Sequence, residues 1–231
     1  MKTIFHFLYG RHGSIICAAV PSESQEHCMH LISLKRKQRI WIPAHGGDDP
    51  GMIGVVGLKE KGINLEISLR LKAVLEKNGF TVVMTREKDK GLNDENSSNK
   101  KAQDMQRRIA FLNDKNPVLT VSIHQNSYSD PAVNGPQVFY YENSEEGKKF
   151  AEILQESLNR TLAPGRPRKV KGNTSYYLLK RSKGTLVIVE CGFLTNPAEA
   201  ELLQDDGYQQ KIAEAIGAGI QEYVKEKYRS Q

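Results

Sequence analysis

Cysteine is scarce in this chain, and its placement excludes a framework of cysteines. Three cysteines occur among 231 residues, and no two of them form a CxxC pair. Cys17 and Cys28 belong to an irregular N-terminal segment, whereas Cys191 follows an apolar run that we interpret as a buried strand. A cysteine-based zinc knuckle is therefore not expected, and Cys191 is expected to be a small core residue.

The sequence also has no apolar run of the length that a transmembrane helix needs. Apolar stretches at residues 4–9 and 14–20 are separated by an Arg-His-Gly sequence, and neither approaches the roughly 20 residues that span a bilayer. The same segment lacks the features of a clean signal peptide. We therefore expect residues 1–38 to form an irregular leader, at most an atypical export segment, and residues 39–231 to form one folded domain.

Positive charge is in excess, but little of the excess belongs to the expected domain. The formal net charge is +6, and residues 1–40 alone carry +4 of it. Those basic residues are not interleaved with aromatic side chains, as they are in many proteins that bind nucleic acids. A nucleic-acid partner is therefore not expected, whereas an anionic wall or membrane surface is compatible with the charge.

From about Arg39 onward, short apolar runs alternate with amphipathic helical patterns. Such alternation favours an α/β fold with a mostly parallel, twisted sheet of about six strands and helices on both faces. The expected strands are residues 40–42, 80–84, 118–123, 137–141, 176–179 and 185–189. The expected helical faces are residues 63–75, 102–112, 150–158 and 212–224, with a further helix start at Asn196-Pro197.

Beyond the first thirty residues, histidine occurs only at His45 and His124, each where a predicted strand meets a loop. Glu190 ends an apolar run, and Glu60 opens the helix that follows the first strand. In open α/β sheets, sites form outside the carboxyl ends of the strands, and two histidines with one carboxylate suit a catalytic zinc ion. Spacing alone leaves a simpler interpretation open, in which the histidines are structural and Glu190 pairs with a basic residue.

A longer set of motifs occurs in order between about Arg39 and Lys225. The motifs are His45-Gly46-Gly47 with Asp48 and Gly51, Leu58-Lys59-Glu60-Lys61 with Asn64-Leu65, Thr85-Arg86, Arg108 with Asn113, Ser122-Ile123-His124-Gln125-Asn126, Gly135, and Val189-Glu190-Cys191-Gly192-Phe193-Leu194-Thr195-Asn196. Together they resemble the zinc-dependent N-acetylmuramoyl-L-alanine amidases of the amidase 3 family. The loop at 87–107 and the sequence Phe139-Tyr140-Tyr141 most resemble the germination-specific spore-cortex amidases.

The resemblance implies a phosphorylase/hydrolase-like catalytic domain. Its substrate would be peptidoglycan, cleaved at the amide between the lactyl group of N-acetylmuramic acid and the L-alanine of the stem peptide. By matching position, His45, Glu60 and His124 would bind one Zn²⁺, and Glu190 would be the catalytic carboxylate that passes a proton from water to the leaving nitrogen. Asn126 would help to hold the peptide.

The resemblance also implies an extracytoplasmic location, at the cell wall or the spore envelope, and it leaves any protein activator unidentified. The family usually has Asp-Pro-Gly before its first ligand, where this chain has Ile42-Pro43-Ala44. Ile42 thus removes a carboxylate that could orient the site, and Ala44 requires a backbone conformation that a residue with a Cβ can adopt. Arg86 is expected to order the edge of the sheet rather than to contact substrate.

Two alternatives stay open at this point. One is a zinc peptidase with the same centre that cuts another amide of the wall. The other is an inactive homologue that only binds peptidoglycan, which the replacements at Ile42 and Ala44 would favour. The products released from peptidoglycan, together with the metal content of the protein, would distinguish the three.

Overall fold

The structure is a computed structural model, and it describes residues 39–42 and 44–229. The expected leader at residues 1–38 lies outside the described residues. The strands are β1 (Arg39–Ile42), β2 (Thr81–Met84), β3 (Leu119–Asn126), β4 (Gln137–Tyr141), β5 (Lys171–Asn173) and β6 (Leu186–Phe193). The helices are the 3-10 turn η1 (Val55–Gly57), α2 (Glu60–Lys77), α3 (Lys100–Lys115), α4 (Glu145–Leu162), α5 (Tyr177–Arg181), α6 (Pro197–Leu202) and α7 (Asp206–Arg229).

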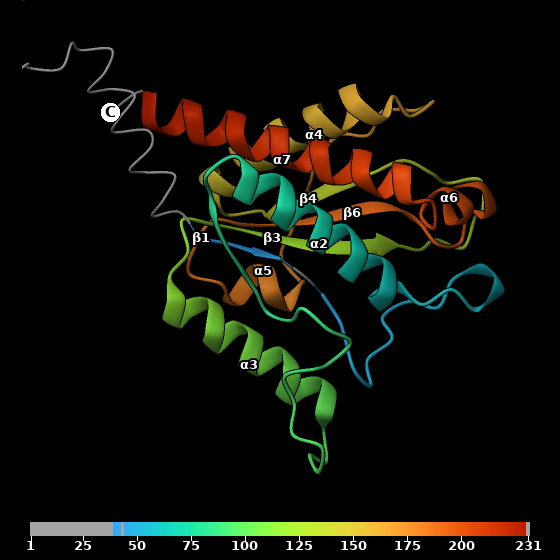
Figure 1. The fold of residues 1–231 in the computed structure, drawn as a ribbon, viewed down its shortest axis with the longest axis vertical. Helices are drawn as coiled ribbons and strands as arrows, with labels where there is room; N and C mark the ends of the chain where they lie inside the picture. Colours follow the sequence, from blue (N-terminus) through green and yellow to red (C-terminus); the bar gives the residue numbers. More distant parts are fainter. Residues whose placement is uncertain (1–38, 43, 230–231) are drawn as a thin grey trace, which may run out of the picture.

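The strands form one sheet in the order β2-β1-β3-β6-β4-β5. Neighbouring strands run parallel except β4 and β6, which are antiparallel. The expected α/β fold with a mostly parallel sheet is therefore confirmed. Helices cover both faces of this sheet (Figure 1), as a parallel sheet with continuous apolar strands requires.

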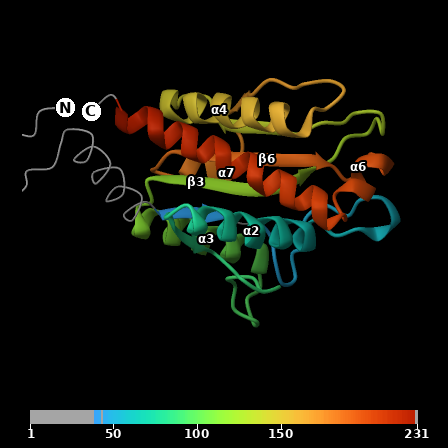
Figure 2. The same ribbon diagram turned by 45° about the horizontal axis from the view of Figure 1, so that its top comes forward.

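One face carries the larger core. Helices α2, α4 and α7 pack there (Figures 1 and 2), and their inward side chains, among them Leu71, Leu154 and Ile216, are completely buried. Helix α7 approaches its neighbours closely because glycine replaces a side chain at two contacts. A Cβ at Gly217 would lie 2.7 Å from a methyl carbon of Val74 on α2.

The opposite face is covered by α3 and α5, which pack over a smaller apolar cluster (Figure 1). Sequence predicted a strand at residues 176–179, and this prediction was wrong, since α5 is a short helix there. An apolar run of four residues fits a buried strand and a buried helical turn equally well. Here Leu179 anchors the turn to the sheet, and the helix makes its own backbone bonds, such as Lys180 N to Tyr176 O at 3.0 Å.

Strand β5 was not expected, because the sequence Lys-Gly-Asn has no apolar pattern. It lies at the edge of the sheet and pairs with β4 through its backbone, so it needs no buried side chain. Strands β3 and β6 also continue beyond the predicted ends at residues 123 and 189. The added residues include His124, Asn126 and Glu190, which are polar and line the cleft. Backbone pairing between the two strands continues through them.

Local signals at two helix ends are confirmed. Asn196 caps α6, with its side-chain oxygen accepting from Glu199 N at 2.9 Å, and Pro197 takes the first helical position. Gly79 follows α2 with a φ of 81°, a conformation that glycine adopts without strain. Cys191 is completely buried, as expected of a core residue.

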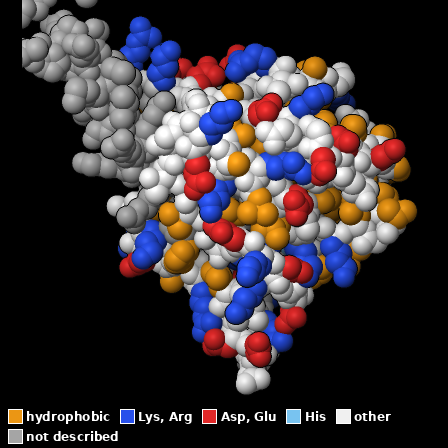
Figure 3. Space-filling model, viewed as in Figure 1, with side chains coloured by type: hydrophobic (Ala, Val, Ile, Leu, Met, Phe, Trp, Pro, Cys, Tyr) orange, Lys and Arg blue, Asp and Glu red, His pale blue; other side chains and the backbone are white. Residues whose placement is uncertain are grey.

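The surface gives no sign of a single-sign charge patch on the face shown in Figure 3. Lysine and arginine side chains alternate there with aspartate and glutamate, with apolar side chains between them. Within residues 39–42 and 44–229, no helix combines the length and the apolar character that crossing a membrane would require.

Candidate metal and catalytic centre

His45, Glu60 and His124 come together at one end of the sheet. One ligand atom of each lies within 4.8 Å of the others. His45 Nε2 is 3.4 Å from Glu60 Oε2, and His124 Nδ1 is 3.1 Å from Glu60 Oε1. Bonds of about 2.0–2.1 Å around a tetrahedral zinc ion place neighbouring ligand atoms about 3.3 Å apart. The donor set and its spacing therefore fit one such ion.

Each of the three residues comes from a different kind of element. His45 lies in the loop after β1 with a φ of 54°, Glu60 is the first residue of α2, and His124 lies within β3. Since β1 and β3 are parallel neighbours, their carboxyl ends meet at the same edge of the sheet. The sequence prediction that these three residues converge is confirmed.

Glu60 is buried and well provided with donors. Met52 N donates to Oε2 at 2.7 Å, and Gln125 N and the side chain of Asn64 donate to Oε1 at 3.0 and 3.1 Å. Burial alone would raise the pKa of Glu60, but the hydrogen bond and charge of His124, with the charge of His45, outweigh it and lower the pKa to about 2. Glu60 is therefore held in the ionised form that a metal ligand requires.

The two imidazoles face each other edge to face, with ring centroids 5.0 Å apart. Burial lowers the pKa of His124, which favours the neutral form that binds metals. His45 Nδ1 lies 2.7 Å from Asp49 Oδ2. That hydrogen bond is the main cause of a lowered pKa at Asp49, which falls to about 2.

Two arginines hold the backbone around His45. Arg86 donates to the carbonyls of Ala44, His45 and Lys61, and Arg108 donates to the carbonyl of His45 at 3.0 Å. Arg86 is buried, and burial followed by the charge of Arg108 lowers its pKa to about 10. These contacts agree with the expectation that Arg86 orders this edge. The left-handed conformation falls on His45, and Ala44 is not among the residues with positive φ.

Glu190 on β6 lies beside His45, Glu60 and His124. It is the direct partner of His124 across the two strands, it is 8% exposed, and it lines a cleft of about 560 Å³ together with those three residues. Its Oε2 is buried with no hydrogen-bond partner among the described residues, and no described ion pair includes it. Burial, then the charge of Glu60, raises the pKa of Glu190 to about 8. The alternative of a structural pairing with a basic residue is thus not what the described residues show.

Asn126 also lines the cleft, as does the tyrosine pair Tyr176 and Tyr177 at the start of α5. The side-chain oxygen of Asn126 accepts from Ser127 N at 2.8 Å, so part of this side chain is engaged in its own loop. Its role toward a peptide stays a prediction. The tyrosines were not predicted as site residues, because the sequence favoured a strand at that position.

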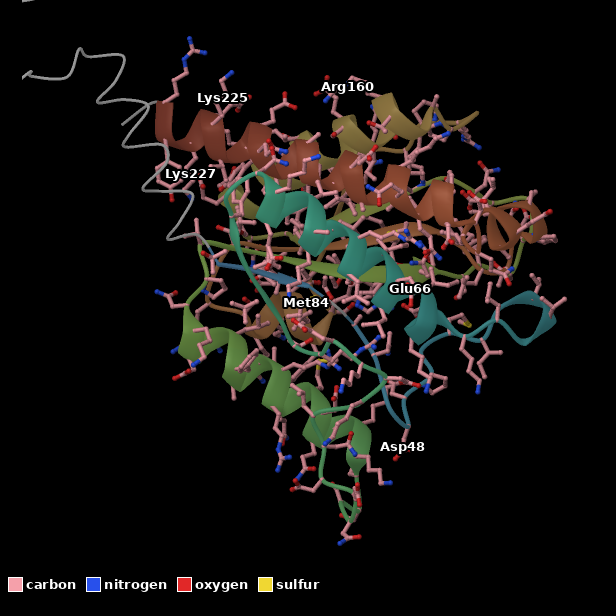
Figure 4. All side chains as sticks on the ribbon, viewed as in Figure 1. Asp48, Glu66, Met84, Arg160, Lys225 and Lys227 are labelled. Carbon is pink, nitrogen blue, oxygen red and sulfur yellow. The ribbon has the colours of Figure 1, made fainter. Side chains whose placement is uncertain are left out.

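Asp49 is a further residue of the site that was not predicted from the sequence. The motif includes Asp48 instead, which lies on the loop between β1 and α2 (labelled in Figure 4). Asp48 is exposed, and its carboxylate accepts from Lys100 Nζ at 2.6 Å. Two adjacent aspartates follow the same His-Gly-Gly sequence. The chain turns at Gly46 and Gly47, both with positive φ, and it is Asp49 that faces His45.

Comparison with known proteins agrees with this geometry. The family Amidase_3, N-acetylmuramoyl-L-alanine amidase, matches residues 40–222. The chain belongs to this family. It is an N-acetylmuramoyl-L-alanine amidase that acts on peptidoglycan, and the activity expected from the sequence is confirmed.

Individual members of the family are similar over most of the chain. The germination-specific N-acetylmuramoyl-L-alanine amidase of Bacillus subtilis is 38% identical over 188 residues, which is 80% of this chain and 78% of the relative. The CwlD amidase of Clostridioides difficile, solved in complex with the GerS lipoprotein, superimposes with a TM-score of 0.79 at 36% identity, covering 81% of this chain and 98% of that one. The amidase AmiC2 of Nostoc punctiforme gives a TM-score of 0.72 at 31% identity, with 82% and 98% covered.

Proposed function

We propose that this amidase is zinc-dependent, with His45, Glu60 and His124 as ligands of one ion and Glu190 as the catalytic carboxylate. Residues 39–231 would form its catalytic domain, of the phosphorylase/hydrolase-like kind. The observation that supports the proposal best is the unpaired, buried Oε2 of Glu190 beside the three ligands. A carboxylate is costly to bury without a partner, so such an atom indicates a chemical role.

The side chains divide the reaction between them. Zinc at such a site supplies Lewis-acid chemistry, which polarises a carbonyl group and lowers the pKa of water. Glu190 accepts a proton from water and delivers it to the nitrogen that leaves as the amine of L-alanine. Its raised pKa suits that exchange near neutral pH. His45, His124 and ionised Glu60 would hold the ligand positions.

The substrate that we propose is the peptidoglycan of the spore cortex. Support comes from the germination-specific amidase of Bacillus subtilis and the CwlD amidase of Clostridioides difficile, both similar over about four-fifths of this chain. A location outside the cytoplasm, at the wall or spore envelope, follows from that substrate. Because the similar CwlD amidase was solved with a lipoprotein, we further propose that a protein partner binds this chain as well.

Product analysis tests the activity and the substrate together. Purified protein, loaded with zinc, is incubated with intact cortex peptidoglycan and with vegetative peptidoglycan, and the fragments are identified by mass spectrometry. Intact stem peptides with a free L-alanine amine are expected, released faster from cortex. Cleavage within the stem would favour the zinc peptidase, and binding without any product, or protein that takes up no zinc, would favour the inactive homologue.

A further inference from the structure

We propose that Asp49 is a positioning residue that fixes the tautomer of His45, so that Nε2 presents its lone pair to the metal. This inference rests on the proposed zinc site. It also identifies a carboxylate, four residues after His45, that contacts the side of the imidazole opposite Glu60.

The contact itself is short and shielded from water. Asp49 Oδ2 lies 2.7 Å from His45 Nδ1, with the two side chains 18% and 16% exposed. A neutral imidazole carries one N–H, so donation from Nδ1 to this carboxylate leaves Nε2 without a proton. Nε2 is the atom that lies 3.4 Å from Glu60 Oε2, on the side of the other ligands.

Asp49 is held in turn by its own loop. Its second oxygen, Oδ1, accepts from Gly51 N at 3.2 Å. The backbones of Gly46 and Asp49 are joined by two hydrogen bonds of 3.1 and 3.2 Å. The carboxylate therefore has one oxygen assigned to the loop and the other assigned to His45. A side chain fixed in this way can impose a ring orientation rather than follow it.

The same assignment predicts what an amide would do in its place. In Asp49→Asn, Gly51 N still requires an acceptor, so the amide oxygen takes the Oδ1 position and the NH₂ group faces His45. His45 Nδ1 would then have to accept, and the proton would move to Nε2, where it blocks the metal. Asp49→Ala imposes neither tautomer, so it should weaken metal binding less than Asp49→Asn does.

Asp48 offers a matched control in the same loop. It carries the same charge one residue earlier, but it pairs with Lys100 on the exposed surface and does not contact the ligands. Asp48→Asn removes one negative charge at nearly the same place. Any difference between the two asparagine variants therefore reports the contact with His45 and not the charge of the loop.

Two measurements test the inference. Competition with a chelator gives the zinc Kd, and loss of an outer carboxylate partner typically costs about 10- to 100-fold in metal affinity. Asp49→Asn should show a loss of that size, and Asp48→Asn should resemble the wild type. Nitrogen NMR of histidine in the zinc-free proteins should show the Nδ1–H tautomer of His45 in the wild type and the Nε2–H tautomer in Asp49→Asn.

The outcomes separate this inference from the proposed function. A wild-type protein that takes up no zinc would contradict the proposed function, while the tautomer measurement on zinc-free protein would still decide the role of Asp49. Equal zinc affinities of Asp49→Asn and Asp48→Asn, or an unchanged His45 tautomer in a folded Asp49→Asn variant, would overturn the inference. Melting of the zinc-free variants shows whether each one is folded.

Discussion

His124 and Glu190 are direct partners on the parallel strands β3 and β6. Partnered residues of neighbouring strands project to the same face of a sheet, so backbone pairing places the proposed metal ligand His124 beside the unpaired carboxylate of Glu190. The chain is irregular immediately afterwards, where the register shifts between His124 and Asn126. Such irregularities redirect side chains at the rim of a sheet, and this one lies where the cleft opens.

Glu190→Gln tests the proposed proton transfer. The amide has nearly the same shape but cannot accept the proton of water, and positioned acid–base groups contribute typically about 10²- to 10⁴-fold to rate. We expect kcat to fall within that range while zinc content is unchanged, measured by release of free L-alanine amines and by metal analysis. Glu201→Gln, an exposed change near the end of α6, is the control. Wild-type kcat in Glu190→Gln would exclude this residue as the catalytic carboxylate.

The raised pKa of Glu190 has a consequence for stability in zinc-free protein. Its pKa rises on folding from an ordinary 4.5 to about 8. The protonated form is therefore favoured by the folded state, and its contribution is complete below the unfolded pKa and is lost as pH rises through the folded pKa. Wild type should lose stability relative to Glu190→Gln between about pH 5 and pH 9, as denaturant unfolding measures. A difference between the two proteins that does not change with pH would contradict the shift.

The parts of the site that depend on the direction and pairing of strands could be predicted from the sequence. His45 and His124 stood out because histidine is rare here, and the strand-to-loop pattern placed both at the same edge of a parallel sheet. Glu190 stood out because an acid ended an apolar strand. These inferences succeed because strand direction and backbone pairing, which the pattern specifies, bring distant residues together.

The rest depended on geometry that no local pattern specifies. Asp49, and not Asp48, faces His45 after the turn at Gly46 and Gly47, which both have positive φ. The two residues are both aspartates, so the residue type does not distinguish them. The helix at Tyr177–Arg181 differs from the expected strand because the segment packs across a sheet face rather than along its edge. A short apolar run contains no information on that placement. The role of Arg86 and Arg108 likewise depends on the backbone carbonyls to which they donate, and the sequence does not specify those contacts.

Arg86 should contribute to stability through those carbonyls. In Arg86→Ala, the carbonyls of Ala44, His45 and Lys61 lose a donor. Arg108 still donates to the carbonyl of His45, and a buried group that is left unsatisfied costs about 1–3 kcal/mol. We expect the free energy of unfolding to fall by about 1–3 kcal/mol, as measured with denaturant. Arg107→Ala, which removes an exposed arginine paired with Asp94, should cost clearly less, because exposed ion pairs contribute little to stability. Similar losses in the two variants would contradict the role assigned to Arg86.

Gly51 and Gly57 provide a matched pair for the packing around Glu60. Both have positive φ, 68° and 76°, so alanine at either position bears a backbone cost of about 1–2 kcal/mol. A Cβ at Gly51 would lie 2.5 Å from Glu60 Oε2, whereas a Cβ at Gly57 would have no heavy atom within 4 Å. The backbone cost is therefore similar in the two variants, and a difference between them reports the contact of the new Cβ with Glu60.

Gly51→Ala should accordingly displace Glu60 and weaken zinc binding, whereas Gly57→Ala should lose only stability. Chelator competition measures the first effect and denaturant unfolding the second. Because Met52 N holds the same Oε2 at 2.7 Å, the carboxylate cannot move aside without losing a hydrogen bond. Equal zinc affinities in the two variants would mean that the loop yields instead, and that Glu60 is positioned by α2, Asn64 and Gln125 without help from residues 51 and 52.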